Sequence, residues 1–189
     1  MDKKTLTGIV LAGGLSKRMG KDKGLVIYQG KRMVEYAIDL LKPYCNEILI
    51  STNNPEYNQL GYPLVADIYI NKGPLGGLHA GLTTSKTEHN LFLSCDMPHV
   101  NSEAVELLIE KVTPNAFGFI PKYGDKIEPM FGIYSEQLLP KIEKSIQKGN
   151  LKMRTFLHEQ TIEYIDFQKL TQKYNNLFSN MNYPNDMIE

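Results

Sequence analysis

Short apolar runs alternate with amphipathic helical patterns along most of this chain, and this alternation limits the fold more than any other feature. Residues 6–11 and 47–51 have the length and composition of buried strands. Between them, apolar side chains recur at i, i+3, i+4 and i+7 over residues 34–41, the stripe of an amphipathic helix. The repeat predicts a mostly parallel sheet flanked by helices: one α/β, three-layer, Rossmann-like domain over residues 1–189.

The same patterns continue to the C-terminal region. Gly124 and Asp125 are expected to turn two later strands antiparallel, and the glycine-rich segment 73–82 is expected to become helical only in its second half. Its first half is interpreted as a loop that closes over a bound nucleotide or an acceptor. Further strands are predicted at 63–67, 90–95, 117–120, 130–134 and 162–166, and further helices from 102, from 135 and over 153–158.

Composition excludes several classes of protein. The 189 residues contain 21 cations and 21 anions, so the formal net charge is zero. A general nucleic-acid or membrane-surface binder usually carries a basic excess, and neither partner is expected here. There are two cysteines, without metal-ligand spacing, and no apolar run of transmembrane length or signal-peptide type. The sequence predicts a reduced, soluble, cytoplasmic protein.

The segment from Leu11 to Lys23 combines a strand end, a double glycine and a group of cations. Glycines let backbone N–H groups approach an anion, and Lys and Arg side chains neutralise phosphate charge. The segment is neither a Walker A loop nor a G-x-G-x-x-G loop. It predicts a site for the polyphosphate of a nucleotide.

Other polar residues follow the remaining predicted strands. Residues 51–53 follow the second strand, Asp67 follows the third and Asp96 follows the fourth. In open α/β sheets, ligands bind outside the carboxyl ends of the strands. Asp22 is interpreted as a solvated turn residue, and Cys95 as a packing residue rather than a nucleophile.

Four segments together carry a family resemblance. Residues 11–23 resemble Leu-Ala-Gly-Gly-x-Ser-x-Arg-Met-Gly-x-x-Lys, the signature of small nucleotidyltransferases with the nucleotide-diphospho-sugar transferase fold, in particular the molybdenum cofactor guanylyltransferases. Residues 73–77, 95–98 and 180–186 are similar to that family's Gly-Pro-Leu-x-Gly, Cys-Asp-x-Pro and C-terminal Asn-x-Asn motifs. Related cytidylyltransferases more often carry Ala at the place of Gly13, where a missing Cβ leaves room beside a purine.

The resemblance implies how the guanine nucleotide is held. Leu11, Ala12 and Gly13 would bind it through their backbone, with Gly14 beside them, and Asp67 would help to hold the base or ribose. The sequence departs from the family at one place on this side. Some members carry an Asn where this chain has Ser51, so that either residue 53 or 54 substitutes or the contact is lost.

The resemblance also implies which residues act on the phosphates. Lys23 would reach them, Arg18 would neutralise the β- and γ-phosphates as they leave, and Asp96 would bind Mg²⁺, the implied cofactor. This agrees with the chemistry, because nucleotidyl transfer needs cations and positioning more than a general base. Asn180 and Asn182 would serve the pterin side, where Tyr183 replaces the family's usual Thr.

The implied activity is transfer of GMP from Mg-GTP to the terminal phosphate of Mo-molybdopterin, with release of pyrophosphate. The implied partners are GTP, molybdopterin or Mo-molybdopterin, other proteins of cofactor synthesis and the molybdoenzymes that accept the product. Two alternatives remain open at this point. One is a cytidylyl- or sugar-phosphate nucleotidyltransferase of the same fold, and the other is a non-catalytic protein that binds the nucleotide or the cofactor.

Overall fold

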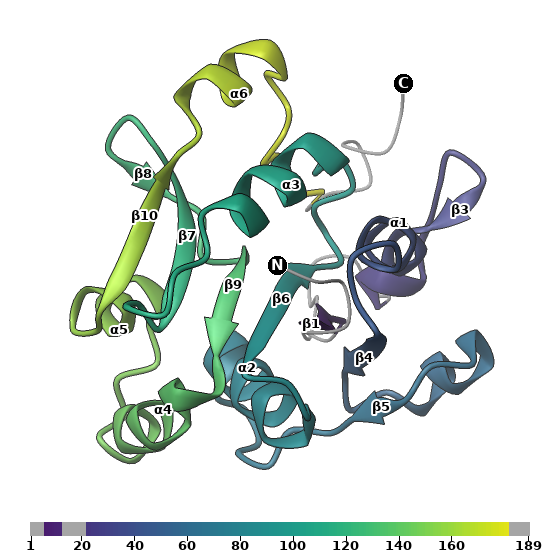
Figure 1. Ribbon diagram of the computed structural model, residues 1–189. Coiled ribbons are helices and arrows are strands. Elements are labelled where there is room, and N and C mark those ends of the chain that lie inside the picture. Colours follow the sequence, from purple (N-terminus) through teal and green to yellow (C-terminus); the bar gives the residue numbers. More distant parts are fainter. Residues whose placement is uncertain (1–5, 13–21, 182–189) are drawn as a thin grey trace.

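The computed structural model describes residues 6–12 and 22–181 (Figure 1). In this part of the chain, eight strands form one sheet with the order β10-β7-β9-β6-β1-β4-β5, and β8 pairs with β7. A separate hairpin joins β2 and β3. The strands are β1 (Leu6–Leu11), β2 (Ile27–Tyr28), β3 (Lys31–Arg32), β4 (Glu47–Ser51), β5 (Leu64–Val65), β6 (His89–Ser94), β7 (Gly118–Tyr123), β8 (Lys126–Ile127), β9 (Phe131–Ser135) and β10 (Ile162–Asp166).

The sheet is parallel in its N-terminal half and mixed beyond it. β1 pairs in parallel with both β4 and β6, and β4 pairs in parallel with β5. β9 runs antiparallel to β6 and to β7, while β10 is parallel to β7. The carboxyl ends of β1, β4, β5 and β6 therefore lie along one side of the sheet, called the carboxyl edge below.

Helices cover both faces of the sheet, which gives the expected three layers (Figure 1). Alternate residues of each strand point to opposite faces, so Val10 belongs to the hydrophobic cluster that includes residues of α1 and α3, whereas Ile9 belongs to the cluster that includes residues of α2 and α4. The helices are η2 (Lys23–Leu25), α1 (Met33–Leu41), η3 (Pro55–Leu60), α2 (Gly73–Thr84), α3 (Ser102–Glu110), η4 (Glu136–Leu138), α4 (Leu139–Gln147), α5 (Met153–His158) and α6 (Gln168–Lys173).

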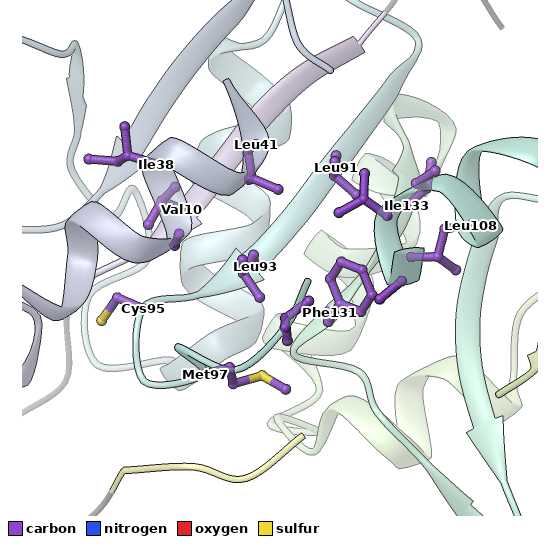
Figure 2. Packing of buried hydrophobic residues seen from close by; sticks show 14 of the residues in the cluster. Val10, Ile38, Leu41, Leu91, Leu93, Cys95, Met97, Leu108, Phe131 and Ile133 are labelled. Atoms are coloured by element: carbon purple, nitrogen blue, oxygen red, sulfur yellow. The ribbon is translucent and has the colours of Figure 1, made fainter. Parts of the chain in front are cut away.

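One of the two large hydrophobic clusters lies on the face of the sheet that α1 and α3 cover. Figure 2 shows Leu41 from α1 and Leu108 from α3 on either side of the buried sheet residue Leu91. Cys95 and Met97 extend this core to the loop that follows β6, and both are buried. The loop that carries Asp96 is thus anchored by an apolar side chain on each side of it.

The segment 73–82 differs from its prediction. It is helical from Gly73 onward as α2, and residues 75–82 are buried, so it is not a loop that closes over a ligand. The glycines allow the helix to lie close to β1: an added Cβ at Gly81 would come 2.7 Å from Ile9 Cγ2. Burial against the sheet outweighs the poor helix propensity of glycine, which is about 1 kcal/mol per residue.

The remaining elements mostly follow the predicted pattern, although η3 was not predicted. Gly124 and Asp125 do turn the chain, but the tight hairpin joins β7 to β8 rather than to β9. The short helix α6 was not predicted. Pro140 lies in the first turn of α4, where its missing N–H costs no hydrogen bond. In the part of the chain that the structure describes, every helix is too short or too polar to cross a membrane.

Candidate active site

Asp96 lies at the carboxyl edge, two residues after the end of β6. The Ser94 hydroxyl donates a 2.6 Å hydrogen bond to Asp96 Oδ1, and the backbone N–H of Met181 donates to the Asp96 carbonyl oxygen at 2.9 Å. The Asp96 side chain is 21% exposed. The carboxylate is therefore held in place by Ser94 and is still accessible to a ligand.

Lys23 faces this carboxylate from the other side of the edge. It begins the short helix η2, and its Nζ lies 3.7 Å from Asp96 Oδ2. The Lys23 side chain is 22% exposed, so the ion pair is only partly screened by water. A cation and a carboxylate held at this distance, at the strand ends, suit a phosphate with its counter-ion.

Asp22 is not the solvated turn residue that the sequence suggested. Its Oδ1 accepts hydrogen bonds from the Tyr57 hydroxyl at 2.5 Å and from the Gly24 backbone N–H at 3.1 Å. Its Oδ2 accepts one from Asn54 Nδ2 at 3.1 Å. Two of these three partners are more than 30 residues away in the chain, so no local pattern could identify this contact.

Asp67 and Asn53 bond to each other across the ends of β4 and β5. Asn53 Nδ2 donates to Asp67 Oδ2 at 3.1 Å, and the Asp67 backbone N–H donates to Asn53 Oδ1 at 2.9 Å. Asn54 is engaged with Asp22, while the buried Ser51 hydroxyl donates to the Gly77 carbonyl at 3.2 Å. Of the two asparagines left open above, residue 53 is therefore the one that lies beside Asp67.

The first strand brings its end to the same place. The backbone N–H of Ala12 donates to the Ser51 carbonyl at 2.9 Å, and the Leu11 carbonyl accepts from the Cys95 N–H at 3.0 Å. These bonds tie the strand end to its neighbours on both sides and fix the point from which the glycine-rich segment leaves. Four of the predicted residues, Gly13, Gly14, Arg18 and Asn182, lie outside the described residues.

The C-terminal motif meets the site through its backbone. Asn180 is exposed, and the next residue, Met181, is buried and bonds to the Asp96 carbonyl as described above. Residues 96 and 181 are 85 positions apart in the sequence. Their contact places the start of the C-terminal Asn-x-Asn motif against the loop that carries the predicted metal ligand.

Glu128 is a carboxylate near the site that sequence reasoning missed. It lies between β8 and β9, is only 9% exposed, and its Oε1 accepts from the Met130 N–H at 3.1 Å. Burial raises the pKa of this carboxyl, and repulsion by Asp96 adds to the rise, whereas the Met130 amide and Arg154 oppose it. A charged residue within the apolar run around 127–133 is the signal that could have drawn attention to it.

Cys95 behaves as predicted, as part of the core. It is buried, and burial raises the pKa of its thiol far above the usual range, with the Asp96 charge adding to the effect. A thiol in this environment stays protonated and is a poor nucleophile. The Cys95 thiol is therefore not a candidate nucleophile.

Comparison with known proteins identifies the family. A model of the MobA-like NTP transferase domain matches residues 8–164. A probable molybdenum cofactor guanylyltransferase from Flavobacterium johnsoniae is 40% identical over 153 residues, which cover 81% of this chain and 80% of that protein. The chain belongs to the MobA-like NTP transferase family.

Other members of the MobA-like family support this over almost the full length. A molybdenum cofactor guanylyltransferase from Vibrio vulnificus is 36% identical over 190 residues, covering 98% of this chain and 95% of that protein. A solved structure of molybdopterin-guanine dinucleotide biosynthesis protein A from Archaeoglobus fulgidus superposes with a TM-score of 0.80, at 24% identity, and covers 96% of this chain and 94% of its own. That last likeness concerns the fold. As a MobA-like protein, the chain is a nucleotidyltransferase.

Proposed function

We propose that this protein transfers GMP from Mg-GTP to the terminal phosphate of Mo-molybdopterin, with residues 1–189 acting as one nucleotidyltransferase domain. An acceptor phosphate oxygen would attack the α-phosphorus of GTP, the bond from that phosphorus to the β-phosphate oxygen would break, and pyrophosphate would leave. The observation that carries the proposal is the meeting of Lys23, Asp96 and the C-terminal motif at the carboxyl edge. Relatives named molybdenum cofactor guanylyltransferase support the choice of substrates.

The residues at this edge fit a magnesium ion. Mg²⁺ is usually held by one or two carboxylates, with substrate phosphates and water completing its shell, and Asp96 presents a fixed, partly exposed carboxylate. When bound, the ion would supply positive charge to the phosphate oxygens during transfer. Members of this family generally use a divalent metal.

The side chains would act mainly through charge and position. Lys23 would bind the triphosphate, and Arg18 would neutralise the leaving pyrophosphate. Because the acceptor is a phosphate that is already anionic, no side chain needs to remove a proton from it. The backbone at Leu11, Ala12 and Gly13, with Gly14, would hold the nucleotide.

The two ends of the edge would receive the two substrates. Asp67, held by Asn53, would contact the base or ribose of GTP. Asn180 and Asn182 would contact the pterin, because the backbone of Met181 attaches their segment to the Asp96 loop. The product would then pass, in the cytoplasm, to other proteins of cofactor synthesis or to the molybdoenzymes that use it.

The test is an incubation of the purified protein with Mg²⁺, Mo-molybdopterin and each α-labelled nucleoside triphosphate in turn. We expect label from GTP in the pterin dinucleotide, and pyrophosphate release that needs both substrates. Incorporation of CMP without GMP would contradict the guanine assignment. Tight nucleotide binding without pyrophosphate release would instead favour a non-catalytic binding protein.

A further inference from the structure

We propose that Tyr57 is a positioning residue for the transfer reaction: through Asp22 it holds Lys23 in the direction of the phosphates. The nature of the ligand rests on the proposed function, whereas the contact itself lies within the described residues. Tyr57 is 0% exposed, comes from η3 and packs in the same hydrophobic cluster as Cys95. Nothing in its local sequence marks it as part of an active site.

The hydroxyl of Tyr57 has a polar contact that is specific and directional. It donates to Asp22 Oδ1 at 2.5 Å. Burial raises the pKa of this phenol well above its usual range, and the hydrogen bond to Asp22 adds to the rise, so the hydroxyl remains a donor at any physiological pH. A buried hydroxyl without such a partner would cost free energy, so the pair is expected to persist in the free enzyme.

Asp22 passes this constraint to the backbone around Lys23. The same Oδ1 accepts the Gly24 N–H as the N-cap of η2, and Oδ2 is held by Asn54. The residue before Lys23 is thus fixed through its side chain, and the residue after it through its N–H. Gly24 also packs directly under the Tyr57 hydroxyl, where an added Cβ would clash.

This arrangement bears on Lys23 because a free lysine side chain has many conformations. Its four-carbon stem carries a large rotamer entropy, and a ligand that fixes it must overcome that entropy. A fixed η2 backbone limits the stem to directions that reach Asp96, with Nζ 3.7 Å from Oδ2. Loss of the Tyr57 hydroxyl should therefore weaken triphosphate binding through Lys23 and leave the rest of the fold in place.

The first experiment needs no nucleotide. Wild type and Tyr57→Phe are reductively methylated with formaldehyde and borohydride, and the labelling rates of Lys23 and Lys31 are compared by mass spectrometry. Lys31 pairs with Asp39 on the surface and serves as an internal reference. We expect the Lys23-to-Lys31 ratio of rates to rise about threefold or more in Tyr57→Phe. An unchanged ratio would overturn the proposal.

The matched control is Tyr44→Phe. It also removes a tyrosine hydroxyl that donates to a carboxylate, Glu106, but this pair lies on the surface between α1 and α3. The control should leave the labelling ratio of Lys23 unchanged. A rise of the same size in both variants would indicate general loosening, and would also overturn the proposal.

The second experiment is a double-mutant cycle on triphosphate affinity, measured calorimetrically with Mg-GTP and Mg-CTP. Alone, Tyr57→Phe should weaken binding about fivefold; in a Lys23→Ala background it should have almost no further effect. Equal effects in both backgrounds would mean that Tyr57 acts independently of Lys23, against the proposal. If the effects of the two substitutions are non-additive with Mg-CTP but not with Mg-GTP, the positioning role is supported and the proposed guanylyl transfer is contradicted. The same holds if they are non-additive with Mg-GTP but the protein transfers no GMP.

Discussion

The two sides of Asp96 differ in how their carboxylates are satisfied. On the side of η2 and β4, Asp22 accepts three hydrogen bonds and Asp67 is bonded to Asn53. On the side of β8 and β9, Glu128 is nine-tenths buried, and its Oε1 accepts a hydrogen bond from the Met130 backbone N–H. On the first side, hydrogen bonds hold the carboxylates in place before any ligand binds. On the second side, burial of the Glu128 carboxylate lowers the stability of the fold when that group is charged.

This difference indicates separate tasks. Satisfied polar networks hold side chains rigidly and suit the binding of a nucleotide in one orientation. A buried carboxylate with a raised pKa is expensive, and such groups cluster at sites that bind or react. Variants on the two sides can show whether the first side serves nucleotide binding and the second does not.

The largest expected effect is that of Asp96→Asn. The amide oxygen can still accept from Ser94, so the fold should remain, while loss of the charge should lower the rate of transfer about a thousandfold. The measurement is pyrophosphate release together with the melting temperature. Asp39→Asn, at the surface pair with Lys31, is the control and should retain full activity. Full activity of Asp96→Asn would remove this residue from the site.

Lys23→Ala tests the nucleotide side directly. The loss of a charge-assisted contact should weaken Mg-GTP binding by roughly ten- to a hundredfold, since such contacts contribute about 1.5–3 kcal/mol. The affinity for GMP, which lacks the β- and γ-phosphates, should fall much less in this variant. Lys173→Ala breaks an exposed pair with Glu103 and should leave both affinities unchanged. Equal affinity of wild type and Lys23→Ala for GTP would contradict the assignment.

Glu128→Gln tests the other side through stability. The folded-state pKa is raised, so the folded protein loses stability as the pH rises above the ordinary carboxyl range and Glu128 ionises. Gln keeps the acceptor for the Met130 amide but carries no charge. At pH 8 the variant should be more stable than wild type, and the difference in the free energy of unfolding should shrink toward pH 4. Urea unfolding at both pH values measures this.

The same variant separates the two sides. Its affinity for Mg-GTP should equal that of wild type, because Glu128 lies across Asp96 from the nucleotide residues. A large loss of GTP affinity in Glu128→Gln would contradict this contrast between the two sides. So would a variant that, compared with wild type, is less stable at pH 8 than it is at pH 4.

The smallest expected effect is that of Asn53→Ala. The Asp67 carboxylate would lose its hydrogen bond from Asn53 Nδ2 and become more mobile, and GTP affinity should fall about threefold, because Asn53 acts on the nucleotide only through Asp67. Asn58→Ala, in the η3 helix, is the control variant. If the two variants bind GTP equally well, then Asn53 has no part in holding Asp67 for the nucleotide.

Much of the fold could be predicted because its signals are local. Most strands of the large sheet and most α-helices follow from apolar periodicity within windows of about ten residues. α2 is the clearest exception, since glycine disfavours a helix in isolation and close contact with Ile9 and Leu11 explains why it forms. Tertiary packing makes this segment helical, and local sequence patterns do not reveal such packing.

The site divides in the same way. Lys23, Asp67 and Asp96 could be identified because each follows a predicted strand or a short motif. Asp22 and Tyr57 could not, since they are 35 residues apart and their bond exists only once η3 packs beside η2. Contacts of this kind depend on the assembled fold and not on spacing.

The central claim is that one nucleotide lies across the carboxyl edge with its phosphates between Lys23 and Asp96. A crystal structure with Mg²⁺ and a non-hydrolysable GTP analogue tests it most directly. The account predicts a metal bound to Asp96 and to a phosphate oxygen, Lys23 Nζ at about 3 Å from another phosphate oxygen, and the guanine beside Asp67. A nucleotide bound elsewhere, or one whose phosphates contact neither Lys23 nor a metal on Asp96, would contradict it.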